Sequence, residues 1–159
     1  MDRNSLRSLH SVVRSYVLFH NASRCRARVY WMNYEGDRVL YRTLARGESM
    51  SVDTFVSHPW TFENADTGDS LGAMGRPVFY PRDPKHPNYR PFRTVVAITY
   101  PLYSLRQRCL QTIRDCLSNP EEVDDLELPR SLQKELRELM RKRMFCTAHS
   151  FRHLGEGES

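Results

Sequence analysis

The chain lacks any long apolar segment. Its 159 residues contain no run of about 18 apolar side chains, so we expect no membrane-spanning helix. Residues 1–20 carry charges throughout and lack the apolar centre of a signal peptide. Internal repeats and low-complexity segments are also absent from the sequence. The length and composition favour one compact domain, or one domain plus a small helical appendix.

Cysteine is scarce and forms no recognisable pattern. The cysteines are Cys25, Cys109, Cys116 and Cys146, without a CxxC pair and without the His/Cys spacing of structural zinc sites. Cys109 and Cys116 lie seven residues apart on one predicted helix, which is too far for an easy disulfide. We therefore expect reduced thiols in the cytoplasm and nucleus, no metal site and no cofactor.

Long blocks of one charge are missing as well. The 24 cationic and 19 acidic residues give a formal net charge of +5, and the isoelectric point is about 9.2. The Arg residues are scattered, and the longest Lys/Arg block is 141–143. This mild excess is typical of a solvated surface, so we do not expect nucleic acid as a partner.

The sequence does contain many short strand-like segments followed by helical ones. Alternation and turn residues predict strands at 14–21, 26–34, 39–44, 50–57 continuing through 58–62, 77–80 and 93–100. Three prolines predict a loop at 82–91. We therefore expect an α+β protein in which a β-sandwich precedes a small α-helical domain. The predicted ranges are a flexible leader at 1–11, the sandwich at 12–102, the α domain at 103–145 and a disordered tail at 146–159.

The clearest helical segment runs over 104–117. Ser104 can cap it, and Leu105, Cys109 and Ile113 recur with a spacing of four residues, so they share one stripe. A thiol between two larger aliphatic side chains makes a narrow ridge that fits a partner's groove. Periodicity alone favours an ordinary core stripe packed against the last helix, whereas the neighbouring motifs favour docking.

Two more helical segments follow. Residues 121–127 predict a short acidic helix, and 132–144 predict a longer one. The longer helix carries an apolar stripe made of Leu132, Leu136, Leu139 and Met140. This last helix could pack back on the sandwich.

Polar and aromatic residues alternate near the middle of the chain. Thr54, Val56, His58 and Trp60 share strand parity, which predicts that they point to one face. A lone histidine is most often structural, but the neighbouring Thr and Trp favour a ligand site. An enzyme with a triad of His58, Asp53 and Thr54 is the alternative, although neighbours on one strand seldom converge as a triad does.

Several motifs follow one another in a specific order. They are VYWMNYEG at 29–36, YRTL at 41–44, HPWTF at 58–62, ITYPLYSL at 98–105 and RCLQ at 108–111. Together they resemble the von Hippel-Lindau (VHL) tumour suppressor family over roughly residues 12–144. The resemblance implies a sandwich that binds a hydroxyproline-containing peptide, and an α domain that binds Elongin C.

The same resemblance implies a complete assembly. The partners would be Elongin C, Elongin B, a cullin with its RING protein, and a prolyl-hydroxylated substrate of the hypoxia-inducible factor α type. The chain would be the substrate receptor of this ubiquitin ligase in the hypoxia response. Ubiquitin transfer would belong to the partners, so no catalytic residue is expected here.

The resemblance also implies roles for particular residues. The hydroxyproline-peptide site would comprise Phe19, Trp31, Tyr41, Thr54, Phe55, His58 and Trp60. Thr54 and His58 would bond the hydroxyl, the two Trp rings would pack the imino ring, and Tyr41 would touch the peptide backbone. The family usually has Ser at Thr54, Tyr at Phe55 and Arg at Met50. We therefore expect the same central site with different selectivity for flanking residues.

In the helical part the family's Elongin-binding box and cullin segment would both be present. The Elongin C contacts would be Ser104, Leu105, Arg108, Cys109, Leu110 and Ile113, with Leu105 as the anchor. The cullin contacts would be Pro120, Val123, Leu126 and Leu128. Asp124 and Asp125 replace a basic pair expected there, and 128–133 is shorter than the family pattern. The alternative is therefore a non-degradative module that binds Elongin but recruits cullin poorly.

Overall fold

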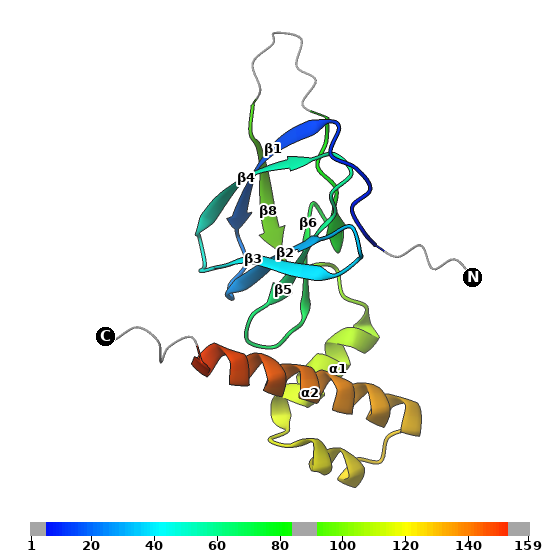
Figure 1. The fold of residues 1–159 in the computed structure, drawn as a ribbon. Coiled ribbons are helices and arrows are strands. Elements are labelled where there is room, and N and C mark those ends of the chain that lie inside the picture. The colour runs from blue at the N-terminus through cyan, green and yellow to red at the C-terminus, as the bar shows by residue number, and fades with distance from the viewer. Residues whose placement is uncertain (1–5, 84–91, 153–159) are drawn as a thin grey trace, which may run out of the picture. The chain divides into compact units, whose positions relative to one another are not determined.

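The structure is a computed structural model that describes residues 6–83 and 92–152. Residues 84–91 of the predicted loop at 82–91 lie outside these residues, as do the extreme ends of the predicted leader and tail. The chain divides into two compact units, and we describe each by itself. The sandwich unit is Met1–Asn64 with Asp69–Pro101, and the helical unit is Ala65–Gly68 with Leu102–Ser159. Figure 1 colours the strands blue to green and the helices yellow-green to red.

The sandwich unit contains eight described strands. They are β1 (Arg14–Asn21), β2 (Ala27–Met32), β3 (Arg38–Leu44), β4 (Ser49–Phe55), β5 (Trp60–Asn64), β6 (Ser70–Ala73), β7 (Val78–Phe79) and β8 (Thr94–Thr99). Their order is β3-β2-β5-β6-β8-β1-β4, with β7 paired to β5. Strand β6 bonds β5 in one layer and β8 in the other, so it joins the two layers into a nearly closed sandwich. The predicted α+β class is confirmed.

Alternation along the strands builds the core of the sandwich. In β1, Val17 and Phe19 are fully buried, whereas the alternating residues Tyr16 and Leu18 are partly exposed. The same period of two buries Val29 on β2 and places it against the opposite layer. The buried cluster also contains Leu44, Val52, Trp60, Phe62, Leu71, Val96 and Ile98.

The helical unit consists of α1 (Leu105–Cys116), the 3₁₀ helix η1 (Pro120–Asp125) and α2 (Arg130–Arg152). Ser104 caps α1 as predicted: its Oγ accepts from the Gln107 backbone N–H at 3.2 Å, and the Gln107 Oε1 accepts from the Ser104 N–H at 2.9 Å. The core contains Leu110, Val123, Leu136 and Met140, and Leu132 and Leu139 pack against it. The predicted apolar stripe on the last helix is therefore confirmed.

One predicted strand is wrong. The segment 50–62 is not continuous, because β4 ends at Phe55 and β5 begins at Trp60. Between them the His58 backbone N–H donates to the Phe55 carbonyl at 3.0 Å, which closes a turn. Thr54 and Trp60 therefore lie on different strands. The prediction that they point to one face because they alternate along a single strand is wrong.

Both ends of the described chain carry more structure than predicted. Residues 6–11 are not a loose leader, because the buried Ser8 donates from its Oγ to the Met32 carbonyl at 2.6 Å. The His10 backbone is also bonded to Ser57. At the other end, α2 continues through Arg152, beyond the predicted end of its helix at 144. Hydrogen bonds to residues far along the sequence hold residues 6–11, and local periodicity does not reveal such contacts.

Two leucines on α1 allow a matched test of which face is core. Leu110→Ala should lower the free energy of unfolding of the helical unit by about 2–5 kcal/mol, because Leu110 is only 5% exposed. Leu105→Ala is the control and should change it by less than about 0.5 kcal/mol, because Leu105 is 81% exposed. Urea unfolding followed by circular dichroism measures both, and equal losses would contradict the assignment.

Candidate functional site

The turn after β4 brings a hydroxyl group and an indole together. The Trp60 Nε1–H donates to the Thr54 Oγ1 at 3.2 Å. Both residues are buried, with exposed fractions of 3% for Thr54 and 1% for Trp60. The Thr54 oxygen is thus fixed in apolar surroundings, while its own O–H proton can still be donated.

Aromatic rings from several elements surround this corner. Tyr41 on β3 lies edge-on to Trp60 with ring centroids 4.8 Å apart, and it is 51% exposed. Trp31 on β2 lies 5.3 Å from the His58 ring, and Phe55 lies 5.1 Å from it. The structure therefore brings together Trp31, Tyr41, Thr54, Phe55, His58 and Trp60 of the predicted site.

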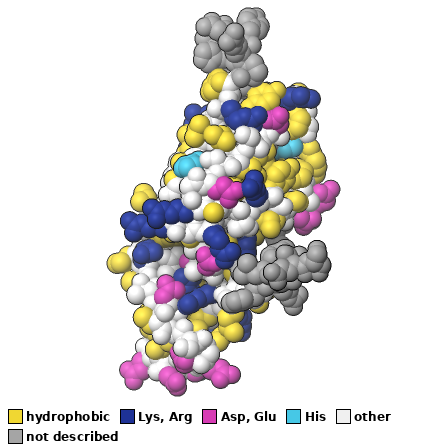
Figure 2. Space-filling model, turned by 90° about the vertical axis from the view of Figure 1, so that its left-hand side faces the viewer, with side chains coloured by type: hydrophobic (Ala, Val, Ile, Leu, Met, Phe, Trp, Pro, Cys, Tyr) yellow, Lys and Arg dark blue, Asp and Glu magenta, His cyan; other side chains and the backbone are white. Residues whose placement is uncertain are grey.

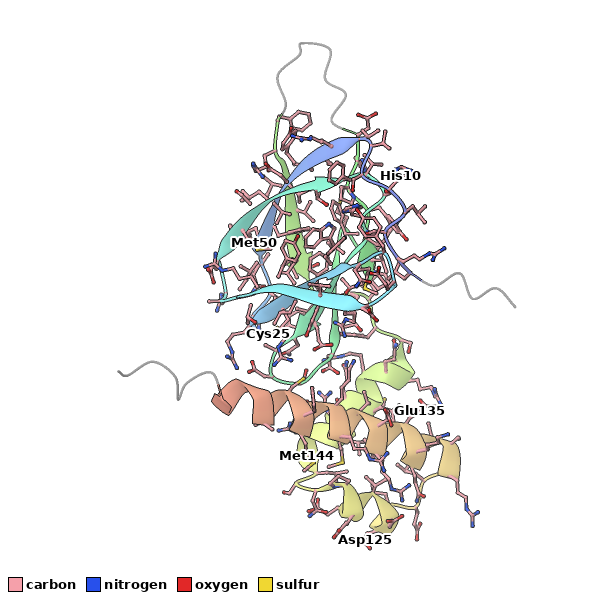
Figure 3. The ribbon with its side chains drawn as sticks, in the orientation of Figure 1. His10, Cys25, Met50, Asp125, Glu135 and Met144 are labelled. Carbon is pink, nitrogen blue, oxygen red and sulfur yellow. The ribbon has the colours of Figure 1, made fainter. Side chains whose placement is uncertain are left out.

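Phe19 does not share this position. It is fully buried, and its ring lies 5.2 Å from Trp60 as part of the sandwich core. Its role is to support Trp60 from the core, so the prediction that Phe19 contacts a peptide is corrected. Met50, the position of a predicted change in selectivity, is partly buried against the same core and is labelled in Figure 3.

His58 is held by groups that the sequence did not point to. Its Nε2 lies 3.3 Å from the Ser11 Oγ and 3.3 Å from the Tyr34 Oη. Burial lowers the pKa of His58 below its usual 6.5, and a backbone hydrogen bond with His10 opposes this only in part. The imidazole is therefore neutral near pH 7. Ser11 carries no periodic signal in the sequence, because the contact bridges 47 residues.

The enzyme alternative fails on geometry. Asp53 and Thr54 are consecutive in β4, so their side chains point to opposite faces of the strand. The Asp53 carboxylate accepts from Arg93 at 2.8 Å on the exposed side. The side chains that contact the His58 ring nitrogen are those of Ser11 and Tyr34, so Asp53 does not orient it as a triad requires.

The α1 helix presents an apolar stripe to solvent. Leu105 is 81% exposed, and Cys109 is exposed one turn further on. Leu102, which the sequence analysis missed, is 98% exposed and lies just ahead of the cap. Arg108, also exposed, lies above the Tyr103 ring at 5.9 Å. We define the docking stripe as Leu102, Leu105 and Cys109.

Two predicted docking residues lie elsewhere on α1. Leu110 belongs to the helical core, so its side chain is unavailable to a partner, and that prediction is corrected. Ile113 is partly buried against the same core, so only its edge extends the docking stripe. The exposed apolar surface of α1 is therefore narrower than predicted, because Leu110 is buried and Ile113 is partly buried.

The predicted cullin contacts have a similar outcome. Val123 is fully buried in the helical core, which corrects its assignment as a contact. Leu126 and Leu128 pack against that core in part, and Pro120 is partly exposed. The exposed side chains of this region are acidic: Glu121, Asp124, Asp125 and Glu127. Figure 2 shows acidic side chains at the lower end of the view, and Figure 3 labels Asp125 there.

A groove of about 570 Å³ lies within the helical unit. It is lined by the end of α1 at Cys116 and Leu117 and by Met140, Arg143 and Met144 on α2. It is distinct from both predicted sites. Among the described residues, no helix is long and apolar enough to cross a membrane, and no group of three metal-ligating side chains is found.

These features define a binding protein with two separate sites, a polar and aromatic one on a β-sandwich and an apolar one on a helix. Comparison with known families agrees with this class. Residues 6–86 match the VHL beta domain, and residues 103–139 match the VHL box domain. The chain therefore belongs to the VHL family. It is similar to Protein Vhl of Drosophila melanogaster, with 28% identity over 140 residues, covering 80% of this chain and 79% of that relative.

The lowered pKa of His58 predicts how stability depends on pH. The unfolded chain takes up this proton near 6.5, whereas the folded chain takes it up only at lower pH. The contribution of His58 to stability is therefore complete above about pH 6.5 and is lost as the pH falls towards the folded-state pKa. Urea unfolding at several pH values should show a weaker loss in His58→Gln than in the wild type. A His58 pKa at or above 6.5 by NMR would contradict the account.

Proposed function

We propose that the chain is a substrate receptor for a ubiquitin ligase, and that it binds prolyl-hydroxylated protein through its sandwich. The observation that carries the proposal is the buried pair Thr54 and His58 among the aromatic rings. Membership of the VHL family supports the same role. Transfer of ubiquitin is left to partner proteins, and the chain itself acts without catalysis. We place this activity in the cytoplasm and nucleus.

The hydroxyl of the ligand would be recognised by complementary hydrogen bonds. Thr54 can donate its O–H, since its oxygen already accepts from Trp60, and the neutral His58 offers a ring nitrogen. An unmodified proline would give neither the Thr54 O–H nor the ligand-facing nitrogen of His58 a hydrogen-bond partner, at a cost of about 1–3 kcal/mol each. The expected preference for hydroxyproline is therefore about 10²- to 10⁴-fold.

The peptide would approach along an edge of the sandwich. In the described sheet, β3 pairs with β2 alone and β4 pairs with β1 alone. Each edge strand thus keeps a row of backbone groups for an added extended segment. Tyr41 lies on β3 and Thr54 on β4, so the proposed site would lie between these edges. We propose a hypoxia-inducible factor α-type segment as the ligand.

The helical unit would attach the receptor to its ligase. The exposed docking stripe has the apolar character and narrow width that a hydrophobic groove of an adaptor requires. The match to the VHL box domain supports Elongin C, with Elongin B, as that adaptor. We propose that the complex then engages a cullin and its RING protein.

Binding of paired peptides tests the sandwich site. A hydroxyproline peptide should bind the full chain about 10²- to 10⁴-fold more tightly than its proline twin by calorimetry. Thr54→Val should reduce this ratio by roughly 10-fold or more, because it removes the donor. Thr54→Ser keeps the hydroxyl and is the matched control. Equal affinity of the wild type for both peptides would refute the sandwich site.

Association with the adaptor tests the helical site. Leu105→Glu should abolish capture of Elongin C, because it puts a charge into the proposed apolar contact. Arg106→Glu on the neighbouring exposed position is the control for charge alone. Bound adaptor should also raise the melting temperature of the wild type, since it binds only the folded chain. An unchanged melting temperature, or capture by the Leu105 variant, would count against this site.

The non-degradative module remains the second candidate, and one observation favours it. The segment 120–128 exposes acidic side chains and hides Val123. Asp124 is itself paired with Arg137. Titration of the purified Elongin complex with cullin separates the two: saturable binding supports the receptor, and absence of binding supports the module.

A further inference from the structure

The segment that precedes β1 forms hydrogen bonds with residues around the aromatic site. Ser8 accepts from the Trp31 Nε1–H at 2.8 Å through its Oγ, and its backbone N–H donates to the Asn33 carbonyl at 3.0 Å. The Val56 N–H donates to the Val13 carbonyl at 3.0 Å. Figure 3 labels His10 in this segment. Residues 8–13 are therefore a fixed part of the sandwich unit.

Within this segment one hydroxyl meets a second from the β2–β3 turn. The Ser11 Oγ and the Tyr34 Oη are 2.6 Å apart, and each lies 3.3 Å from the His58 Nε2. Each contact with the nitrogen is longer than the 2.7–3.2 Å that is usual for such bonds. The hydroxyl pair thus orients this nitrogen and, through it, the imidazole ring.

Tyr34 is itself held in place. The Asn33 Oδ1 accepts from the backbone N–H groups of Glu35 and Asp37, which fixes the turn. The Tyr34 ring stands edge-on to Trp31 at 5.7 Å and to His58 at 5.6 Å. With 42% of its surface exposed, Tyr34 contributes little to the core. Its packing suits a residue that orients its neighbours.

We propose that the hydroxyls of Ser11 and Tyr34 position His58 for recognition of the hydroxylated ligand. This inference rests on the proposed function and extends it to two residues outside the predicted site. A neutral imidazole has one donor and one acceptor nitrogen. Partners at one nitrogen fix the rotation of the ring before the ligand arrives, so binding orders fewer groups.

Single-atom deletions test this role. Tyr34→Phe and Ser11→Ala should each weaken binding of the hydroxyproline peptide by about 3- to 10-fold, while binding of the proline twin hardly changes. The double variant should lose less than the product of the two, because the hydroxyls act as a pair. The nitrogen NMR shifts of the His58 ring should change in both variants, which a purely structural defect elsewhere would not cause.

Matched variants complete the test. Ser11→Thr keeps a hydroxyl, so it should retain the wild-type preference for the hydroxyproline peptide that Ser11→Ala reduces. Tyr16→Phe removes a tyrosine hydroxyl from the partly exposed side of β1 and should leave the preference unchanged. The positioning role is wrong if the wild type prefers hydroxyproline and both Tyr34→Phe and Ser11→Ala have the same affinity for that peptide and the same His58 nitrogen shifts as the wild type. Tighter binding by the variants would also overturn it. A wild type without preference would instead reject the proposed function.

Discussion

The hydrogen bond from the Trp60 indole to the Thr54 hydroxyl holds the sandwich site together. It joins the end of β4 to the start of β5 across a turn. Both partners are buried, so the bond forms in apolar surroundings where an unpaired group would be costly. The Thr54 oxygen is consequently oriented, and its O–H is the donor that the proposed site would offer to a ligand.

The two sites use opposite physical strategies. On the sandwich, the polar groups of Thr54 and His58 are buried, so the proposed ligand would bind more tightly with a hydroxyl than without one. On α1, apolar side chains are kept in water, so that a partner's groove gains from covering them. In the proposed function, specificity for a modification and attachment to an adaptor would thereby lie in separate units of one chain.

Periodic features were predictable from the sequence. The bounds of β1 follow from strict alternation, and the cap at Ser104 follows from residue type at a helix start. Alternation along one strand predicted that Thr54 and Trp60 lie together, but a turn between β4 and β5 interrupts that alternation. Contacts that span many residues, such as Ser11 with His58, leave no local pattern. Burial of Leu110 depends on α2 and η1, which periodicity on α1 cannot place.

The most direct measurement is a crystal structure of the full chain with a hydroxyproline-containing peptide. The account predicts the ligand hydroxyl within about 2.7–3.2 Å of both the Thr54 Oγ1 and a His58 ring nitrogen, with the imino ring against Trp31 or Trp60. A peptide bound in the groove between α1 and α2, or a hydroxyl turned away from Thr54 and His58 into solvent, would contradict it.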